Sequence, residues 1–281
     1  MEFKKGFKIK PKSIKRTGEV IFTDGTNDVF ANQKICKEYG YNYDTSNGTC
    51  YAYRYVSLTE KRGKNLDNKV AGKNNLTSDG TKASFITGQS NSTDGSNKNI
   101  LITGENNKIQ SDLNNSSIIG GTHGLGLHNG EVVIGGGLYD GSEVGSNQMS
   151  FTQLSGQTTG TDATSLTTQN DGTNLVEIQN NSILGFEAHI IALCTGGSSG
   201  TAGQYIYYKL VGACKTDNGF NPTFTQSIST IADGNLSIVT TPRFVAVTDP
   251  FISIQVTGLA NVNINWYSSV HLYTNRTLQT F

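Results

Sequence analysis

The 281-residue sequence predicts an all-β protein, in which a parallel β-roll or solenoid lies between an N-terminal anchor segment and a C-terminal antiparallel β-sandwich. Three observations predict this class. A 16-residue repeat fills the middle of the chain, apolar and polar residues alternate in its last third, and 33 residues are glycine, about 12% against a usual ~7%. Such a composition favours short strands and tight turns over helices.

The expected domains are a basic N-terminal arm and anchor at 1–65, the repeat at 66–140, a linker or stalk at 141–174 and the sandwich at 175–281. The net charge is zero, which argues against nucleic-acid binding across the whole surface. No run of 18 apolar residues occurs, so a membrane-spanning helix is not expected either.

The N-terminal segment is basic. Residues 1–65 hold 13 of the 22 basic residues and 7 of the 22 acidic ones, a net charge of +6. The excess lies in the arm Met1–Arg16, where apolar residues interleave with lysines, a pattern suited to docking on an acidic surface. A solvated terminus is the alternative interpretation. The residues expected to anchor the chain to a larger assembly are Phe3, Lys4, Lys5, Phe7, Lys8, Ile9 and Lys10.

Four cysteines occur, and none forms a CxxC pair, so the sequence indicates neither zinc nor thioredoxin chemistry. Cys36 and Cys50 flank a loop and could pair, but reduced thiols are the expectation if the protein assembles in a cytoplasm. Cys194 and Cys214 are expected to be buried core thiols.

A triplet of a β-branched residue, any residue and glycine recurs every 16 residues in the middle of the chain. Each unit fits two short strands and two turns, which is one coil of a solenoid, with coils stacked at ~4.8 Å. Asparagines three residues after the glycines are expected to stack as ladders. The repeated positions are Val70, Ile86, Ile102, Ile118 and Ile134, then Gly72, Gly88, Gly104, Gly120 and Gly136, and finally Asn75, Asn91 and Asn107.

Four to five coils make a column of only ~20–25 Å. So short a stack leaves apolar ends and cannot bury both faces of its sheets. A homotrimer around a common axis buries a second face between chains. The residues expected in the trimer core are Val70, Ile86, Ile102, Ile118 and Ile134.

The clearest copies of the repeat, Ser116–Gly120 and Glu131–Gly135, resemble the head repeats of trimeric autotransporter adhesins. The resemblance covers about residues 66–140 and implies a trimeric, left-handed parallel β-roll. Another parallel β-solenoid is the alternative.

Alternation beyond Leu175 predicts seven to eight strands in an antiparallel sandwich or jelly-roll-like barrel. In about residues 158–275, the order of Thr161–Thr164, Val256–Gly258 and Ile264–Trp266 resembles a β-sandwich found at the C-termini of bacteriophage tail and fibre proteins. The resemblance brings no catalytic residue, and Trp266 is expected to be a core anchor.

The sequence offers little sign of chemistry. The GxSxG match at Gly196–Gly200 lies between two expected strands, whereas a hydrolase elbow requires a helix after it. His123 and His128 are a weak metal signal. A glycosidase needs paired carboxylates on one groove, and the spacing of the available ones does not group them. These are Asp112, Glu131, Asp140 and Glu143. The expectation is therefore no enzyme, no cofactor and no metal.

Together these modules indicate a homotrimeric structural fibre of a bacteriophage virion. The architecture and the Cys36–Tyr55 tract resemble head fibres of crAss-like phages, which implies a capsid-attached fibre that is assembled in the host cytoplasm. Its partners would be itself, virion proteins bound by the N-terminus, and a host-surface glycan or protein. A tail or baseplate receptor-binding fibre is the first alternative and a bacterial surface adhesin the second.

Overall fold

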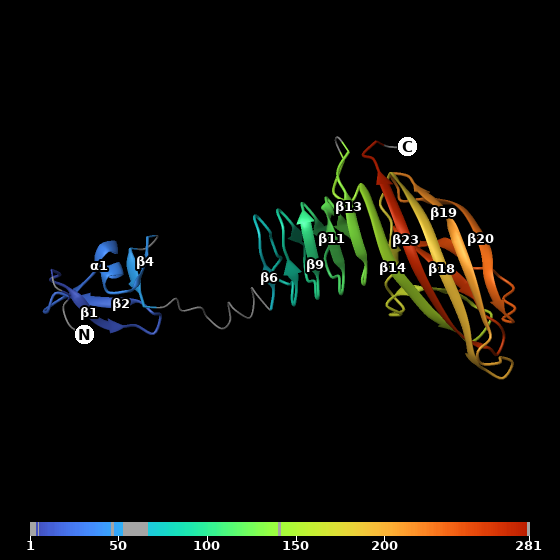
Figure 1. Cartoon of the computed structure of the whole chain (residues 1–281), viewed down its shortest axis with the longest axis horizontal. Coiled ribbons are helices and arrows are strands. Elements are labelled where there is room, and N and C mark those ends of the chain that lie inside the picture. Colours follow the sequence, from blue (N-terminus) through green and yellow to red (C-terminus); the bar gives the residue numbers. More distant parts are fainter. Residues whose placement is uncertain (1–3, 5, 46–47, 53–66, 140–141, 280–281) are drawn as a thin grey trace. The chain divides into compact units, whose positions relative to one another are not determined.

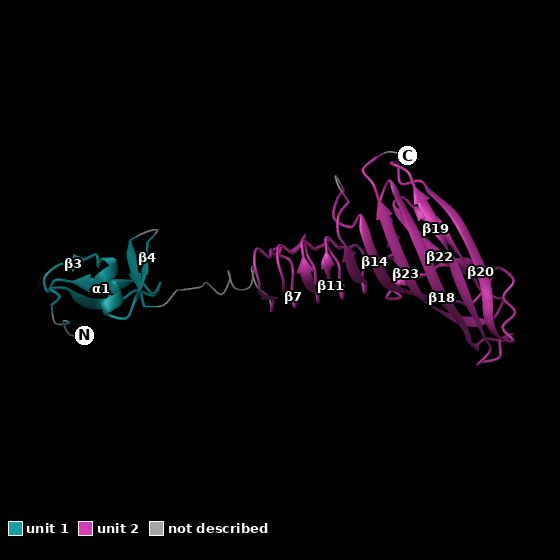
Figure 2. Cartoon of the chain, turned by 45° about the horizontal axis from the view of Figure 1, so that its top comes forward, with its two compact units in different colours: residues 1–63 teal, residues 64–281 magenta. Residues whose placement is uncertain are grey.

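The computed structural model describes residues 4, 6–45, 48–52, 67–139 and 142–279. The chain divides into two compact units, Met1–Gly63 and Lys64–Phe281 (Figure 2). Apart from one short helix, the described residues form strands, turns and irregular segments, so the predicted all-β class is confirmed. Within the described ranges no helix is long and apolar enough to cross a membrane.

The first unit is a small α+β module. Strands β1 (Lys10–Ile14), β2 (Val20–Thr23) and β3 (Asp28–Val29) form an antiparallel sheet, and β4 (Asn42–Asp44) pairs with β5 (Thr49–Tyr51). Helix α1 (Gln33–Glu38) begins at Asn32, whose side chain accepts a 3.0 Å hydrogen bond from the N–H of Ile35. The core of the unit contains Val20, Phe22, Ala31, Cys36 and Cys50.

Cys36 and Cys50 form a disulfide, so the expectation of reduced thiols is wrong. Helix α1 carries Cys36 to within 5.8 Å of Cys50 on β5, Cα to Cα, which lies in the usual range for a disulfide. Cys194 and Cys214 are free and buried, as predicted.

The second unit begins with a β-solenoid, which confirms the predicted parallel fold of the repeats (Figure 1). Strands β6 (Lys69–Val70), β7 (Phe85–Ile86), β9 (Leu101–Glu105), β11 (Ser117–Thr122) and β13 (Val132–Gly136) stack in parallel along one side. Strands β8 (Ser92–Thr93), β10 (Lys108–Ile109) and β12 (Leu125–Gly126) form a parallel sheet of their own.

The 16-residue register holds through the first coils and slips in the last. Ile86 pairs with Ile102 and Ile102 with Ile118, and all three are fully buried. Ile118 then pairs with Val133, because β11 and β13 are offset by 15 residues at this point. Val133 is therefore buried, whereas Ile134, the residue expected from the repeat, is 39% exposed.

The repeated glycines allow neighbouring coils to approach closely. Gly88 has a φ of +109°, and a Cβ on it would collide with the carbonyl oxygen of Gly104 in the next coil. The slip changes the later members of this series. Gly121, not Gly120, follows Gly104, and it faces Gly135, not Gly136.

The predicted asparagine ladder is present inside the coils. The Oδ1 atom of Asn75 accepts from the N–H of Asn91, and Oδ1 of Asn91 accepts from the N–H of Asn107. Each Nδ2 also donates to a backbone carbonyl four residues earlier. The ladder satisfies backbone groups at the turns that the sheets leave unpaired.

The solenoid sheet continues into an antiparallel sheet without a break (Figure 1). Strand β14 (Asn147–Thr158) pairs antiparallel with β13, and the next strands are, in order, β23 (Asn263–Arg276), β18 (Ser182–Gly196), β19 (Tyr205–Thr216) and β20 (Pro222–Gly234).

About half of the expected linker at 141–174 is therefore strand. Besides β14 it holds β15 (Ala163–Ser165) and β16 (Thr167–Thr168). The prediction failed because the first half of β14 has inverted polarity. It buries Gln148, Ser150 and Thr152 and turns Met149 and Phe151 outward, so its composition does not look like that of a core strand.

A second sheet packs against the antiparallel one. It contains β15, β17 (Val176–Glu177), β21 (Arg243–Thr248) and β22 (Phe251–Thr257). Buried side chains of both sheets belong to one hydrophobic core, in which Phe186 of β18 and Phe244 of β21 lie 4.4 Å apart, ring centre to ring centre. Trp266 is buried here, as predicted, and its indole N–H donates to Oγ1 of Thr158 at 2.9 Å.

We predict that Asn107→Ala destabilises the second unit by on the order of 3 kcal/mol, at about 1–3 kcal/mol for each buried group left without a partner. Asn107 is fully buried, donates to the carbonyl of Thr103 at 2.9 Å and accepts from the N–H of Gly124 at 2.7 Å. Urea denaturation measures the change. The control is Asn114→Ala, at an exposed position of the same solenoid, and an equal loss there would contradict the ladder's role.

Candidate functional site

A cleft of about 710 Å³ lies in the second unit, where the solenoid meets the C-terminal strands. The solenoid contributes side chains next to β8, β10 and β12. The C-terminal part contributes the segment that follows β17 and the end of β23. The lining residues used below are Asp94, Lys108, Gln110, Leu125, Leu127, Glu143, Glu177, Gln179, Asn180, Phe220 and Arg276.

Two ion pairs border the cleft. Nζ of Lys108 lies 2.7 Å from Oδ2 of Asp94, and Nη1 of Arg276 lies 2.7 Å from Oε2 of Glu143. The Nε atom of Arg276 also donates to the carbonyl of Asn180 at 3.1 Å. These pairs supply cationic donors and carboxylate acceptors to anything that enters the cleft.

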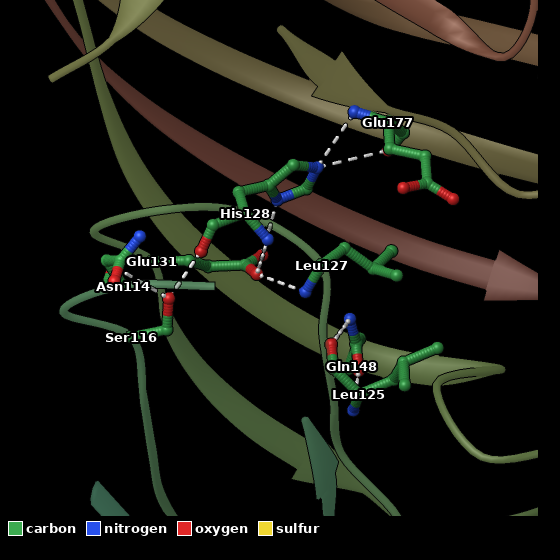
Figure 3. Close-up of polar contacts among 8 residues, drawn as sticks. All are labelled: Asn114, Ser116, Leu125, Leu127, His128, Glu131, Gln148 and Glu177. Atoms are coloured by element: carbon green, nitrogen blue, oxygen red, sulfur yellow. Dashed lines mark hydrogen bonds and ion pairs between the residues drawn. The ribbon is translucent and has the colours of Figure 1, made fainter. Parts of the chain in front are cut away.

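A buried His–Glu pair lies behind the cleft wall (Figure 3). Nδ1 of His128 is 3.0 Å from Oε1 of Glu131, and the two side chains are 3% and 0% exposed. Oε2 of Glu131 accepts from the N–H groups of Leu127 and His128. The pair is thus held by the turn between β12 and β13.

His128 also joins the solenoid to the second sheet. Its Nε2 atom lies 2.9 Å from the backbone N of Glu177 and 3.2 Å from the carbonyl O of the same residue. A neutral ring accepts from the N–H, and a ring protonated at Nε2 donates to the carbonyl. The imidazole therefore has a partner on β17 in either charge state.

Burial by itself would lower the pKa of His128, but the carboxylate of Glu131 outweighs it and the pKa is raised. Burial by itself would raise the pKa of Glu131, but the charge of His128 and the hydrogen bonds to the carboxylate outweigh it and the pKa is lowered. Both directions favour a charged pair in the folded protein.

The carboxyl group of Glu177 lines the cleft and its pKa is raised by its surroundings. Burial is the main cause of this rise, the charge of His128 opposes it, and the negative charge of Glu131 makes the smallest contribution and adds to it. A partly buried carboxyl group with a raised pKa, in a cleft with other carboxylates, is suited to donating a proton.

Sequence reasoning named two of the acidic residues found in this region. Glu143 lines the cleft and Glu131 lies behind it, whereas Asp112 is on an exposed turn of the solenoid and Asp140 lies outside the described residues. Glu177 was missed. A signal existed, because it is a single acidic residue within the apolar run Leu175–Ile178.

His128 was considered as a metal ligand together with His123, but its ring is engaged by Glu131 and Glu177 instead. In the described part of the chain, no three His, Cys, Asp or Glu side chains gather as a metal site would require.

The expected anchoring residues lie partly against the chain's own first unit. The ring of Phe7 is 6.4 Å from that of Tyr39, the carbonyl of Ile9 accepts from the hydroxyl of Tyr39, and Lys10 begins β1. Lys4 and Lys8 are exposed, although Nζ of Lys4 donates to the carbonyl of Glu38. Phe3 and Lys5 lie outside the described residues.

The expected trimer-core residues separate into two groups. Ile86, Ile102 and Ile118 are fully buried within a single chain, where they form the solenoid core with Ile100, Ile109, Leu113 and Val133. Val70, at the first coil, and Ile134, on the outer side of β13, are exposed. Contacts between chains stay a prediction.

No protein family matches the sequence, and no curated protein does. Similar solved structures include the tailspike protein of Acinetobacter phage vB_ApiP_P1, at 8% identity and a TM-score of 0.28, covering 74% of this chain and 47% of that one. They also include the tailspike of Acinetobacter baumannii phage AM24, at 8% identity and a TM-score of 0.24, covering 75% and 49%.

A third similar structure is tailspike protein gp49 of Acinetobacter baumannii bacteriophage Fri1, described as a capsular polysaccharide depolymerase. The identity is 7% and the TM-score 0.28, with 69% of this chain and 38% of that one covered. The chain thus spans less than half the length of each of these tailspikes. This comparison contradicts the expectation that the protein is not an enzyme, and that expectation is withdrawn.

We predict that the His128–Glu131 pair stabilises the second unit most between about pH 4.5 and 6.5, the ordinary pKa values of the two groups. Its contribution declines as pH rises through the raised pKa of His128, because the imidazole loses its charge. It also declines as pH falls through the lowered pKa of Glu131, because the carboxylate is neutralised.

Urea denaturation across about pH 4 to 9 measures this dependence. The comparison is the double variant His128→Gln with Glu131→Gln, which keeps polar groups at both sites and lacks the titration. Parallel stability curves for the two proteins would contradict a charged pair.

Proposed function

We propose that this protein is a homotrimeric attachment fibre of a bacteriophage virion, which binds a host-surface glycan in the cleft beside its solenoid. The observation that carries the proposal is the continuous sheet from β6 to β20. It joins the stacked coils to the C-terminal antiparallel strands through backbone hydrogen bonds, so the cleft beside this junction is lined by elements of one frame.

The lining of the cleft supports a sugar ligand. The side-chain amides of Gln110, Gln179 and Asn180 can both donate and accept hydrogen bonds, as the hydroxyl groups of a sugar require. Leu125, Leu127 and Phe220 add apolar surface for the carbon face of a sugar ring. Because the charged groups at the border are paired, the cleft does not demand a strongly charged ligand.

The first unit is proposed as the virion anchor, on the capsid in preference to the tail. Its support is the net charge of +6 on residues 1–65 and the exposure of Lys4 and Lys8. Since Phe7 and Ile9 pack partly within the unit, we expect its folded surface, rather than a free arm, to make the contact.

We predict that Lys108→Ala and Asp94→Ala each weaken binding to host-surface polysaccharide by about tenfold or more, because each removes a cleft-lining group and exposes its partner. The pair is solvent-exposed, so the loss of stability should stay below about 1 kcal/mol.

The measurement is binding of the purified full chain to a panel of bacterial surface polysaccharides, with the variant Lys98→Ala as the control. Lys98 is exposed on the same solenoid and does not line the cleft. Binding that is unchanged in both cleft variants would rule out this site.

Cleavage of the bound polysaccharide is a second candidate function, and Glu177 is the observation that favours it. Its raised pKa and its place in a cleft that also holds Glu143 and Asp94 suit a general acid for glycoside hydrolysis.

We predict that Glu177→Gln lowers polysaccharide cleavage by about 10²-fold or more, since the amide has no proton to give. Release of reducing ends measures the activity, and Glu105→Gln, at an exposed carboxylate of the solenoid, is the control. If the wild-type chain binds a polysaccharide and releases no reducing ends from it, attachment alone is the function.

A further inference from the structure

A stripe of apolar side chains runs along the outer face of the continuous sheet, opposite the solenoid core and the C-terminal core. We define it by Phe85, Ile119, Ile134, Met149, Phe151 and Tyr273. Phe85, Ile119, Ile134, Met149 and Tyr273 are each 39–48% exposed.

The pairing register makes these residues neighbours. Ile134 pairs with Met149, and Met149 pairs with Tyr273 on its other side. In the next row, Val132 pairs with Phe151. Alternation along each strand places all of them on the face away from Val133 and Ser150, which are buried. These pairings carry the stripe from the last coil across β14 to β23, whereas Phe85 pairs with Leu101 and Ile119 with Thr103 in the earlier coils.

We infer that this outer stripe is the face through which copies of the chain associate side by side. The inference deepens the proposed homotrimer and rests on it. The strands that carry the stripe follow one another in the sheet order β7, β9, β11, β13, β14 and β23, and Figure 1 shows that the coils stack in this direction. A rotation axis parallel to that direction brings the same stripe of each copy to the centre at every level, which closed symmetry requires.

The area of the stripe fits such an interface. At about 150–250 Å² for a whole aromatic side chain, and somewhat less for an aliphatic one, the exposed fractions leave roughly 400–500 Å² of apolar surface. A stable interface buries about 800 Å² on each partner, of which a little over half is apolar. The stripe thus supplies the apolar share of one such face.

The charges also fit contact between identical copies. The outward positions of β7, β11, β13 and the facing part of β14 carry no charged side chain, and on β9 the one charged residue is the exposed Glu105 at its end. Beyond the stripe, Glu187 on β18 is paired with Lys209 at 2.8 Å and with His189 at 3.1 Å. Apart from Glu105, self-association through the stripe therefore sets few like charges against each other.

The test uses the full chain and the variants Met149→Lys and Ile119→Lys. Sedimentation velocity should give the wild type a mass near three times 30.2 kDa, and each variant should weaken association by about tenfold or more. Val239→Lys is the control, at a position that is 88% exposed and outside the stripe. Circular dichroism shows whether the variants are folded.

A second measurement does not depend on disrupting the interface. Copies of Met149→Cys should cross-link to one another on mild oxidation, because the axis brings the same position together, and Val239→Cys should not. The native thiols Cys194 and Cys214 are buried and do not compete. Two results would overturn the inference that the stripe is the association face. One is a wild-type oligomer mass in both lysine variants, and the other is equal cross-linking of Met149→Cys and Val239→Cys.

The outcomes separate this inference from the proposed function. If the wild type is oligomeric and the lysine variants keep its mass, the stripe is not the association face, but the proposed fibre function still stands. A wild type that is monomeric at micromolar concentration overturns both the face and the homotrimer. Glycan binding in the cleft is measured independently of either result.

Discussion

The antiparallel pairing of β13 with β14 is the contact on which the second unit depends. A parallel solenoid ends in a strand edge whose N–H and C=O groups have no partner, and such an edge favours aggregation. Here β14 covers that edge and pairs with β23 on its other side. One row of backbone hydrogen bonds thus closes the last coil and begins the C-terminal sheet.

The inverted polarity of β14 follows from this position. Its inward side faces the turn that holds the His128–Glu131 pair, where the carboxamide of Gln148 accepts from the N–H of Leu125 and donates to its carbonyl. Polar side chains are needed there because the buried groups of the last coil lack the coil that would otherwise satisfy them. Met149 and Phe151 of β14 are consequently left on the outer face, where the stripe lies, whereas Leu154 further along the strand is buried.

The cleft and the stripe are therefore two consequences of one junction. On the inner side, joining a solenoid to two packed sheets leaves a hollow lined by groups from both, among them Lys108 and Arg276. On the outer side, the same junction leaves a flat apolar surface. The surfaces proposed for glycan binding and for self-association thus adjoin the same junction.

Several features could be predicted from the sequence because they depend on local repetition. The glycine and isoleucine spacing predicts the parallel coils, Asn75, Asn91 and Asn107 predict the ladder, and alternation around Trp266 predicts the buried strand. These patterns repeat the same physical requirement every 16 or every 2 residues, so they are visible without knowledge of distant contacts.

Only the tertiary structure decided the remainder, because it depends on residues far apart in the chain. Val133, and not Ile134, occupies the buried row because the pairing of β11 with β13 is shifted by one residue. Such a shift moves every side chain of a strand to the other face. The Cys36–Cys50 disulfide depends on how α1 packs. The site of Glu177 is set by His128, 49 residues earlier, and by burial at a junction that no local pattern encodes.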